Sequence, residues 1–210
     1  HGYTAQLHVI SNGISPEYFY GKQPKETWMQ GFFNVLMVGR YAGEKRQDEL
    51  IAACTKCRHA KEIQVILAGR GPLEKKYRRL AEKLPNPIVM SFYEPARLLE
   101  ILHMADLYVH TSDAEIEAMS CMEAFACGLV PVIADSPRSA TPQFALDERS
   151  LFPAGDTDVL AERIDWWLEH PEERREMELR YAEHAKQYTL EHSIQQTEEM
   201  FRMAIREQRG

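Results

Sequence analysis

The 210-residue sequence lacks any apolar run approaching the ~20 residues that a membrane-spanning helix needs, and it begins with no signal-peptide pattern. It also lacks an excess of basic residues: 25 Lys and Arg stand against 32 Asp and Glu, for a formal net charge of −7. A nucleic-acid surface or an anionic-membrane surface would need a basic face. We therefore expect a cytoplasmic protein with no nucleic-acid partner, in which any phosphate-binding site is local.

Cysteine is scarce, with four residues in the chain, which makes no disulfide scaffold and fits a reducing compartment. Cys54 and Cys57 form a C-x-x-C pair, but no second pair follows at the spacing of a zinc site. Cys121 and Cys127 lie among small residues of another helical pattern. We predict that all four are structural thiols.

Short β-branched runs alternate with amphipathic stretches of about ten residues, which is typical of parallel βαβ units. The predicted strands are residues 7–10, 34–38, 65–68, 88–90, 107–110 and 130–134. The predicted helices between them are residues 47–57, 73–84, 97–103 and 117–127, followed by 156–169, 172–188 and 190–206. The sequence thus predicts an α/β fold, a doubly wound parallel sheet with C-terminal helices. Ligands of such sheets bind at the loops that follow the strands.

The loop after residues 34–38 places two cations just past a strand end. Gly39 allows the backbone to approach a ligand, Arg40 can bind two phosphate oxygens, and Lys45 adds a point charge. This arrangement suits a diphosphate, although a solvated basic turn before a helix is an equal alternative. The next loop begins with Gly69-Arg70-Gly71-Pro72, and it favours a tight turn over a dinucleotide fingerprint because Glu74 occupies the place of the third glycine.

Two glutamates mark the next candidate site. Glu115 lies at the mouth of the predicted helix 117–127 and Glu123 lies two turns inside it. At ~1.5 Å per residue their backbones would lie roughly 12 Å apart, which is too far for a glycosidase pair but suits two hydroxyl-bearing rings flanking a diphosphate. A polar helix face is the alternative. Small apolar neighbours favour the first interpretation, because a carboxylate there needs a partner.

Two further patterns have simpler explanations. Asp156-Thr157-Asp158 imitates a metal-binding motif, but it opens a predicted helix, so we expect Asp156 to be an N-cap and expect no metal site. Trp166 and Trp167 fall within an amphipathic helix and are expected in the core and at its rim rather than under a sugar.

Taken together, these segments resemble the C-terminal, donor-binding domain of family-four retaining glycosyltransferases of the GT-B fold, in order and over nearly the whole chain. The residues that carry the resemblance are 12–14, 38–40 with Lys45, 68–72, 105–109, the two glutamates, 123–128 and 131–133. Within that family the chain more closely resembles bacterial lipid α-glucosyltransferases, including the cholesterol α-glucosyltransferase type, at residues 136–137, 139–141, 143–152 and 164–169.

The resemblance implies a Rossmann-like half of an enzyme that transfers a hexose with retention, using a UDP-sugar donor, with glucose as the hexose, and no metal. It makes Arg40 and Lys45 the pyrophosphate clamp, Glu115 the contact to the hexose hydroxyls and Glu123 the contact to the ribose diol. The remaining donor-binding residues that it implies are Gly39, Gly69, Phe92, Tyr93, Ile116, Glu117 and Ala118, with the base near Ser91. Ile116-Glu117 departs from the family pattern, as does the loop 136–138, which lacks the usual glycine pair.

The resemblance also suggests how the chain is divided. Residues 1–188 would form the nucleotide-sugar-binding domain, and residues 189–210 a helix that packs toward an N-terminal acceptor domain not in this sequence. The start at His1 rather than Met fits a piece of a longer protein. We expect the missing domain to bind a lipid or saccharide acceptor and to make any contact with the inner membrane face. The chain alone would then not catalyse transfer.

Several other functions remain open at this point. A GT-B sugar-nucleotide epimerase or an inverting transferase would share the donor site. A stand-alone nucleotide or dinucleotide module would bind without transfer. A receiver-like interaction domain would need an acidic cluster after its first strand, and no such cluster is apparent.

Overall fold

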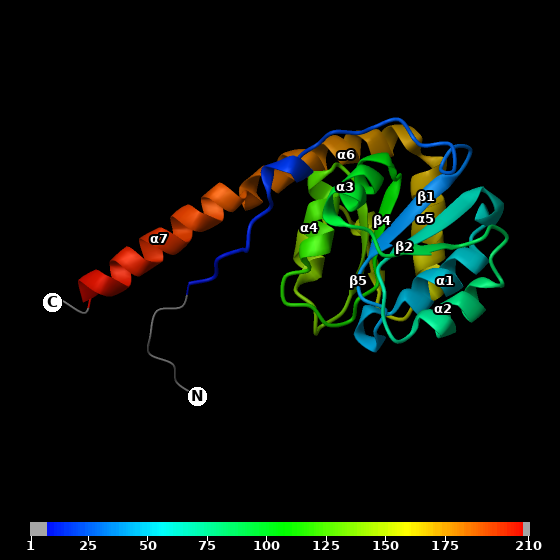
Figure 1. The fold of residues 1–210 in the computed structure, drawn as a ribbon, viewed down its shortest axis with the longest axis horizontal. Helices are drawn as coiled ribbons and strands as arrows, with labels where there is room; N and C mark the ends of the chain where they lie inside the picture. The colour runs from blue at the N-terminus through cyan, green and yellow to red at the C-terminus, as the bar shows by residue number, and fades with distance from the viewer. Residues whose placement is uncertain (1–7, 208–210) are drawn as a thin grey trace.

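The computed structural model describes residues 8–207 as a six-stranded parallel sheet covered by helices, with one helix projecting away from it (Figure 1). The strands are β1 (Phe33–Val38), β2 (Ile63–Ala68), β3 (Val89–Ser91), β4 (Leu107–His110), β5 (Pro131–Asp135) and β6 (Leu151–Pro153). The helices are α1 (Gln47–Lys56), α2 (Glu74–Ala81), α3 (Pro95–Met104), α4 (Met119–Ala126), α5 (Thr157–Glu169), α6 (Pro171–Ala185) and α7 (Leu190–Glu207). The predicted α/β fold is confirmed.

The strands are ordered β3-β2-β1-β4-β5-β6, so the chain proceeds outward from the centre first in one direction and then in the other. Val35 in β1 is in register with Val65 in β2 and with Leu107 in β4. Because parallel crossovers are right-handed, the reversal of direction places α1 and α2 on one face and α4 on the other. Consistently, α1 packs against α5, and α4 packs against α6.

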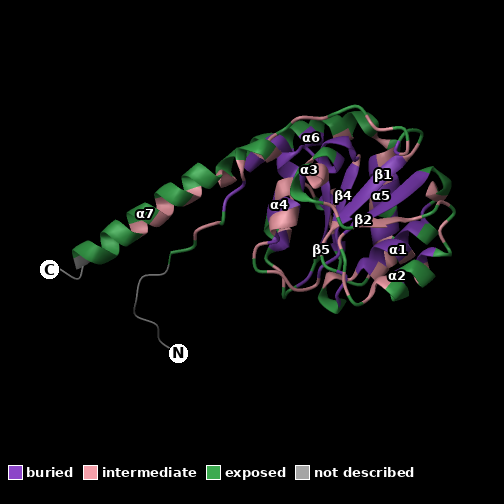
Figure 2. Cartoon of the chain, in the orientation of Figure 1, coloured by how far each residue is buried: buried purple, intermediate pink, exposed green. Residues whose placement is uncertain are grey.

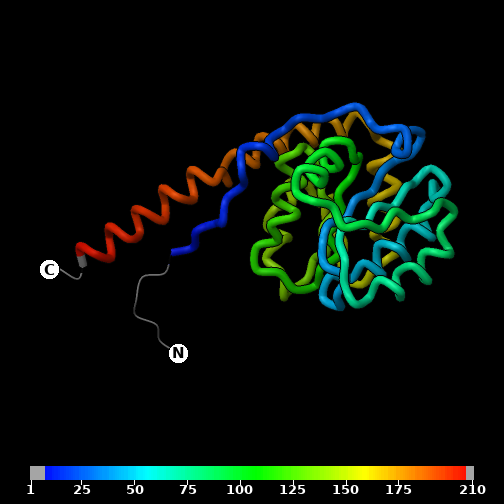
Figure 3. The backbone as a smooth tube through the Cα atoms, in the orientation of Figure 1, coloured from blue at the N-terminus to red at the C-terminus, as the bar shows by residue number. Residues whose placement is uncertain are grey.

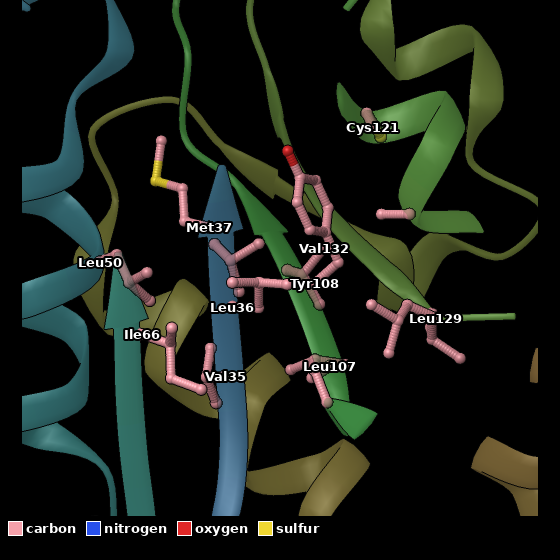
Figure 4. Packing of buried hydrophobic residues seen from close by; sticks show 14 of the residues in the cluster. Val35, Leu36, Met37, Leu50, Ile66, Leu107, Tyr108, Cys121, Leu129 and Val132 are labelled. Carbon is pink, nitrogen blue, oxygen red and sulfur yellow. The ribbon is translucent and has the colours of Figure 1, made fainter. Parts of the chain in front are cut away.

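Helices on both faces bury the central strands, as Figure 2 shows. Val35, Leu36 and Met37 are consecutive residues of β1, and all three are buried. In Figure 4 the strand that carries them lies between β2 with Ile66 and β4 with Tyr108. This explains why the strands appear in the sequence as continuous apolar runs rather than as alternating ones.

The cysteines and tryptophans take the places expected for core residues. Cys54, Cys57, Cys121 and Cys127 are all buried free thiols. The side chain of Trp167 is fully buried, while Trp166 is partly exposed and stacks on His170. The predictions of structural thiols and of a core-plus-rim tryptophan pair are both confirmed.

The amino-terminal and carboxy-terminal segments lie side by side, as the tube in Figure 3 shows. Ile14 forms a parallel bridge with Thr189, and its backbone N–H donates to Tyr188 O at 2.6 Å. Gly13 has a φ of +80°, and a Cβ there would lie 2.7 Å from the Leu190 backbone, so this junction requires a glycine. Farther along, Lys22 forms an ion pair with Glu178 of α6 at 3.4 Å.

Three sequence predictions differ from the structure. Residues 8–10 of the expected strand 7–10 form no strand, and Leu7 lies outside the described residues. The short strand β6 was not predicted. Helix α4 begins at Met119 rather than at Glu117, because Ala118 has a left-handed backbone with a φ of 54°.

Helix α7 begins at Leu190, one residue inside the expected C-terminal segment 189–210, and the division of the chain at residue 188 stays a prediction. It exposes Ile194, Phe201 and Ile205. Its packing toward another domain stays a prediction. No helix within residues 8–207 is both long enough and apolar enough to cross a membrane.

Candidate functional site

The site lies where the strand order changes direction, between β1 and β4. In an open parallel sheet, the crevice outside the carboxyl ends of the strands at this point is where ligands bind. The loop 39–46 follows β1 and the loop 111–118 follows β4, so both border the crevice. The two loops are joined directly, because Asp113 N donates to Glu44 O at 3.0 Å.

Lys45 and Glu115 meet across this crevice. Lys45 Nζ donates to Glu115 Oε1, and the two side chains are 23% and 13% exposed. Burial opposes ionisation of Glu115, but contacts with His110 and Lys45 outweigh it and lower its pKa to about 2. Glu115 is therefore an anion at every physiological pH. The structure brings together two site residues that the sequence separates by 70 positions.

His110, which the sequence reasoning missed, is the third member of this cluster. It ends β4 with only 1% of its side chain exposed, and its Nε2 lies 3.4 Å from Glu115 Oε1. Its Nδ1 lies 3.4 Å from Tyr108 Oη. Burial lowers the pKa of His110, so the ring is neutral at pH 7. The available signal was a polar residue ending a buried apolar strand just before a candidate loop.

Arg40 lies beside this cluster. The side chain is exposed and has no ion-pair or hydrogen-bond partner among residues 8–207. Its backbone is held, because Gln47 Nε2 donates to Arg40 O at 2.8 Å. Gly39 adjoins Lys45: a Cβ there would lie 3.7 Å from Lys45 Cδ. Arg40 is thus placed to bind an incoming anion, whereas Lys45 is already paired.

A cleft of about 620 Å³ opens next to Arg40. The predicted residues that line it are Gly39, Arg40, Gly69, Phe92 and Tyr93, together with Val38, Ala68, Arg70, Gly71, Pro72 and Leu98. The Arg70 guanidinium lies 4.3 Å from the centre of the Phe92 ring. This exposed aromatic and cationic surface can stack a flat heterocycle. Arg70 was not predicted, and Ser91 does not line the cleft.

The floor of this cleft is formed by two loops in close backbone contact. A Cβ at Gly69 would lie 2.0 Å from Gly39 O, and one at Gly71 would lie 2.5 Å from Tyr41 O. Tyr41 N donates to Arg70 O at 3.1 Å, and Leu73 N donates to Tyr41 O at 3.2 Å. The glycines of the second loop therefore serve a tight turn against the first loop, as the sequence favoured.

Residues 116–118 lie apart from this cleft. Ile116 is 94% exposed. The Glu117 carboxylate accepts hydrogen bonds from Asn12, including two from its backbone N–H at 3.1 and 3.2 Å. Ile116 and Glu117 instead line a second cavity of about 970 Å³ between Asn12 and helix α7. Glu117 thus binds the amino-terminal segment.

Glu123 lies on α4 in a different environment from Glu115. Burial raises its pKa, and the Tyr18 hydroxyl acts in the opposite direction. Tyr18 ends a short 3-10 helix, Pro16–Tyr18, and its own pKa rises to about 12 through burial and through the charge of Glu123. Because residues 115–118 are not helical, the separation of 12 Å expected from helical rise does not apply. Glu123 does not line the cleft beside Arg40.

Asp156 is the N-cap of α5, as predicted. Its Oδ1 accepts from Asp158 N at 3.1 Å and from Val159 N at 3.0 Å. In the part of the chain that the structure describes, no group of three His, Cys, Asp or Glu side chains could hold a metal ion. A metal-free clamp stays a prediction.

Two variants distinguish the capping hydrogen bonds of Asp156 from an effect of its negative charge. Asp156→Ala should lower the free energy of unfolding by about 1 kcal/mol, because two amides lose their acceptor. Asp156→Asn should stay within a few tenths of a kcal/mol of the wild type, since Asn caps equally well. Thermal denaturation measures both. Equal destabilisation by Asn and Ala would contradict the cap.

Comparisons with known proteins identify relatives of the chain. The family described as "Glycosyl transferases group 1" matches residues 22–187. The catalytic domain of cholesterol-alpha-glucosyltransferase from Helicobacter pylori is 48% identical, with a TM-score of 0.72, and the match covers 75% of this chain and 99% of that one.

Two more distant relatives extend the comparison. The Bacillus subtilis (strain 168) protein EpsD, named as a glycosyltransferase, is 28% identical over 200 residues, covering 87% of this chain and 52% of EpsD. The chain thus spans about half the length of this curated relative. Anabaena Alr3699/HepE, solved in complex with UDP-glucose, is 20% identical with a TM-score of 0.79, covering 93% of this chain and 57% of that one.

Proposed function

Because the chain belongs to the group 1 glycosyltransferases, we propose that it is the donor-binding half of a retaining enzyme that transfers glucose from UDP-glucose to a lipid or saccharide hydroxyl. The relative with 48% identity is an alpha-glucosyltransferase acting on cholesterol, which supports glucose as the sugar and a lipid as the acceptor. UDP-glucose carries an α-linked glucose, so an α-linked product means retention.

The observation that carries this proposal is the contact between Lys45 and Glu115 at the switch point of the sheet, beside Arg40, whose side chain has no partner within residues 8–207. A diphosphate needs cations and a hexose needs hydroxyl acceptors, and here both lie within one crevice. The cleft at Phe92 and Tyr93 adds a surface for the base. A sugar nucleotide contains these three parts in the same order.

In the proposed reaction, negative charge builds up on the leaving diphosphate. Arg40 and Lys45 stabilise that charge, as a divalent metal does in other enzymes. Glu115 accepts hydrogen bonds from the hexose hydroxyls, and Glu123 accepts them from the ribose diol. Gly39 and Gly69 let the loop 39–46 and the loop after β2 lie in close contact, so the backbone that carries Arg40 and Lys45 is held in place.

The acceptor and the cellular location belong to the proposal as well. We assign acceptor binding, and any contact with the inner membrane face, to a domain outside this sequence. A cytoplasmic reaction is supported by the four buried free thiols, which suit a reducing compartment.

A thermal-shift screen tests the donor assignment. UDP and UDP-glucose should raise the melting temperature more than GDP, ADP or NAD at equal concentration, since a ligand that binds only the folded state stabilises it. A larger shift with NAD would favour a dinucleotide-binding module instead.

We expect UDP binding to survive chelation. With millimolar EDTA, the Kd of UDP measured by calorimetry should change less than about twofold, because Arg40 and Lys45 supply the positive charge. Added Mg²⁺ should give no tighter binding. Loss of binding in EDTA would contradict the metal-free clamp.

A further inference from the structure

The ion pair between Lys45 and Glu115 poses a problem for the proposed function, on which the following inference rests. The half-buried Glu115 carboxylate neutralises the Lys45 ammonium. A diphosphate gains most from Lys45 when that charge is available to it. Yet a buried carboxylate that loses its cation needs another donor. Donor binding therefore calls for a second partner of Glu115.

His110 fits that role by position. Its Nε2 lies 3.4 Å from Glu115 Oε1, which is long for a hydrogen bond, and this nitrogen has no hydrogen-bond partner among residues 8–207. A polar atom buried without a partner is uncommon and costs stability. With a proton on Nε2, a shift of a few tenths of an ångström would make His110 a donor to the carboxylate.

We propose that donor binding exchanges the partner of Glu115: Lys45 turns to the diphosphate, and His110 becomes the positioning residue that holds the carboxylate toward the hexose. No covalent bond changes in this step. The imidazolium form of His110 would bind Glu115 more strongly than the neutral ring, so the exchange draws one proton from solvent onto the ring.

The charges around His110 determine the direction of this proton uptake. Tyr108 faces it from β4 itself, Lys45 from the loop after β1 and Glu115 from the loop after β4. Helix α4 contributes Ser120, whose hydroxyl oxygen accepts a hydrogen bond from Tyr108 Oη. It also contributes Cys121, whose pKa is raised by burial and by the charge of Glu115. Burial lowers the pKa of His110, Glu115 raises it and Lys45 lowers it further.

When Lys45 turns to an anionic diphosphate, its effect on His110 shrinks and the pKa of the ring rises. A ligand that raises a pKa binds more tightly as pH falls through the interval between the free and bound values. The affinity for UDP-glucose should thus increase below neutral pH, by at most about tenfold per pH unit for one proton.

The exchange can be tested first without any donor. In NMR titrations, the pKa of His110 should rise in Lys45→Met, because this variant removes the cation as donor binding would. It should fall in Glu115→Gln. His110→Gln identifies the signal among the eight histidines, and Lys45→Gln replaces Lys45→Met if the latter fails to fold. An unchanged titration of His110 in the Lys45 variants would overturn the proposal.

The second test measures protons during binding. UDP-glucose is the probe, since its β-phosphate is esterified to glucose and so lacks the second ionisation near pH 6 that the terminal phosphate of UDP has. Calorimetry at pH 6.5 in buffers of different ionisation enthalpy should show net proton uptake by the wild type and almost none by His110→Gln. The glutamine amide can still donate to Glu115, so its affinity should stay within about threefold.

His110→Phe is the variant that lacks the donor altogether. It should bind UDP-glucose at least about tenfold more weakly and UDP more weakly as well, because either diphosphate takes Lys45 from Glu115 and leaves the carboxylate without a donor. Equal proton uptake by His110→Gln and the wild type would refute the exchange. If the wild type bound no UDP-glucose, the proposed function would fail, whereas the titration in Lys45→Met would still decide the ion-pair exchange.

Discussion

Gly69→Ala is expected to destabilise the protein by at least about 3 kcal/mol and to lower its melting temperature by roughly 6–12 °C. The added Cβ would lie 2.0 Å from Gly39 O and 2.9 Å from the Gly39 carbonyl carbon. Both atoms belong to the backbone, so no side chain can move aside to make room. Either the first loop shifts or β2 ends differently, and both outcomes move Arg40.

Gly43→Ala provides the matched control for this change. It adds the same methyl group to the same loop system, but nothing lies within 4 Å of its Cβ. Its melting temperature should stay close to that of the wild type, within the ±0.5 kcal/mol typical of unconstrained surface positions. Differential scanning calorimetry compares the variants. If Gly69→Ala melted like Gly43→Ala, the close contact of the two loops would be wrong.

Glu123→Gln should weaken the binding of both UDP and UDP-glucose, by about 1.5–3 kcal/mol or roughly 10- to 150-fold. The proposed ribose diol is common to both ligands, and a charged acceptor is lost in both complexes. Burial already raises the pKa of Glu123, so the substitution removes an anion that the empty protein stabilises poorly. The variant should therefore remain folded.

Glu115→Gln should behave differently, since Glu115 is assigned to the hexose alone. UDP affinity should hold within roughly 0.5 kcal/mol or improve, because Lys45 is released from its ion pair. The extra affinity of UDP-glucose over UDP should disappear. Isothermal titration of both ligands measures this, with the exposed Glu162→Gln on α5 as a control. Equal losses of UDP and UDP-glucose in Glu115→Gln would refute the division of roles.

The sheet was predictable because its strands are buried on both faces. Residues 35–38 and 107–109 are continuous apolar runs, and they lie in β1 and β4. The exception is β6, where Leu151–Pro153 is only three residues long and ends in a proline. Strand β6 is stabilised by pairing with β5, and a local sequence pattern cannot predict that pairing.

The candidate site was predictable only in part. The glycines and cations after β1 have a local signature, so Arg40 and Lys45 could be found from spacing. The contact of Lys45 with Glu115 and His110 depends on how two loops meet across the sheet, which no local pattern encodes. The start of α4 was misplaced because Ala118 has a left-handed conformation that favours glycine, so its position before the helix has no signature in the sequence.

The buried cysteines make the protein a natural subject for measurements of local opening. Cys54 lies in α1 and Cys121 in α4, on opposite faces of the sheet, and each thiol is inaccessible while its helix is packed. The contact with Cys57, together with burial, raises the pKa of the Cys54 thiol, and burial raises that of Cys121, so neither reacts until its helix opens. Alkylation rates at the two positions therefore report the opening free energy of each face separately. Comparing them with and without UDP would show whether a ligand at the switch point tightens both layers of the fold or only the one that contains α4.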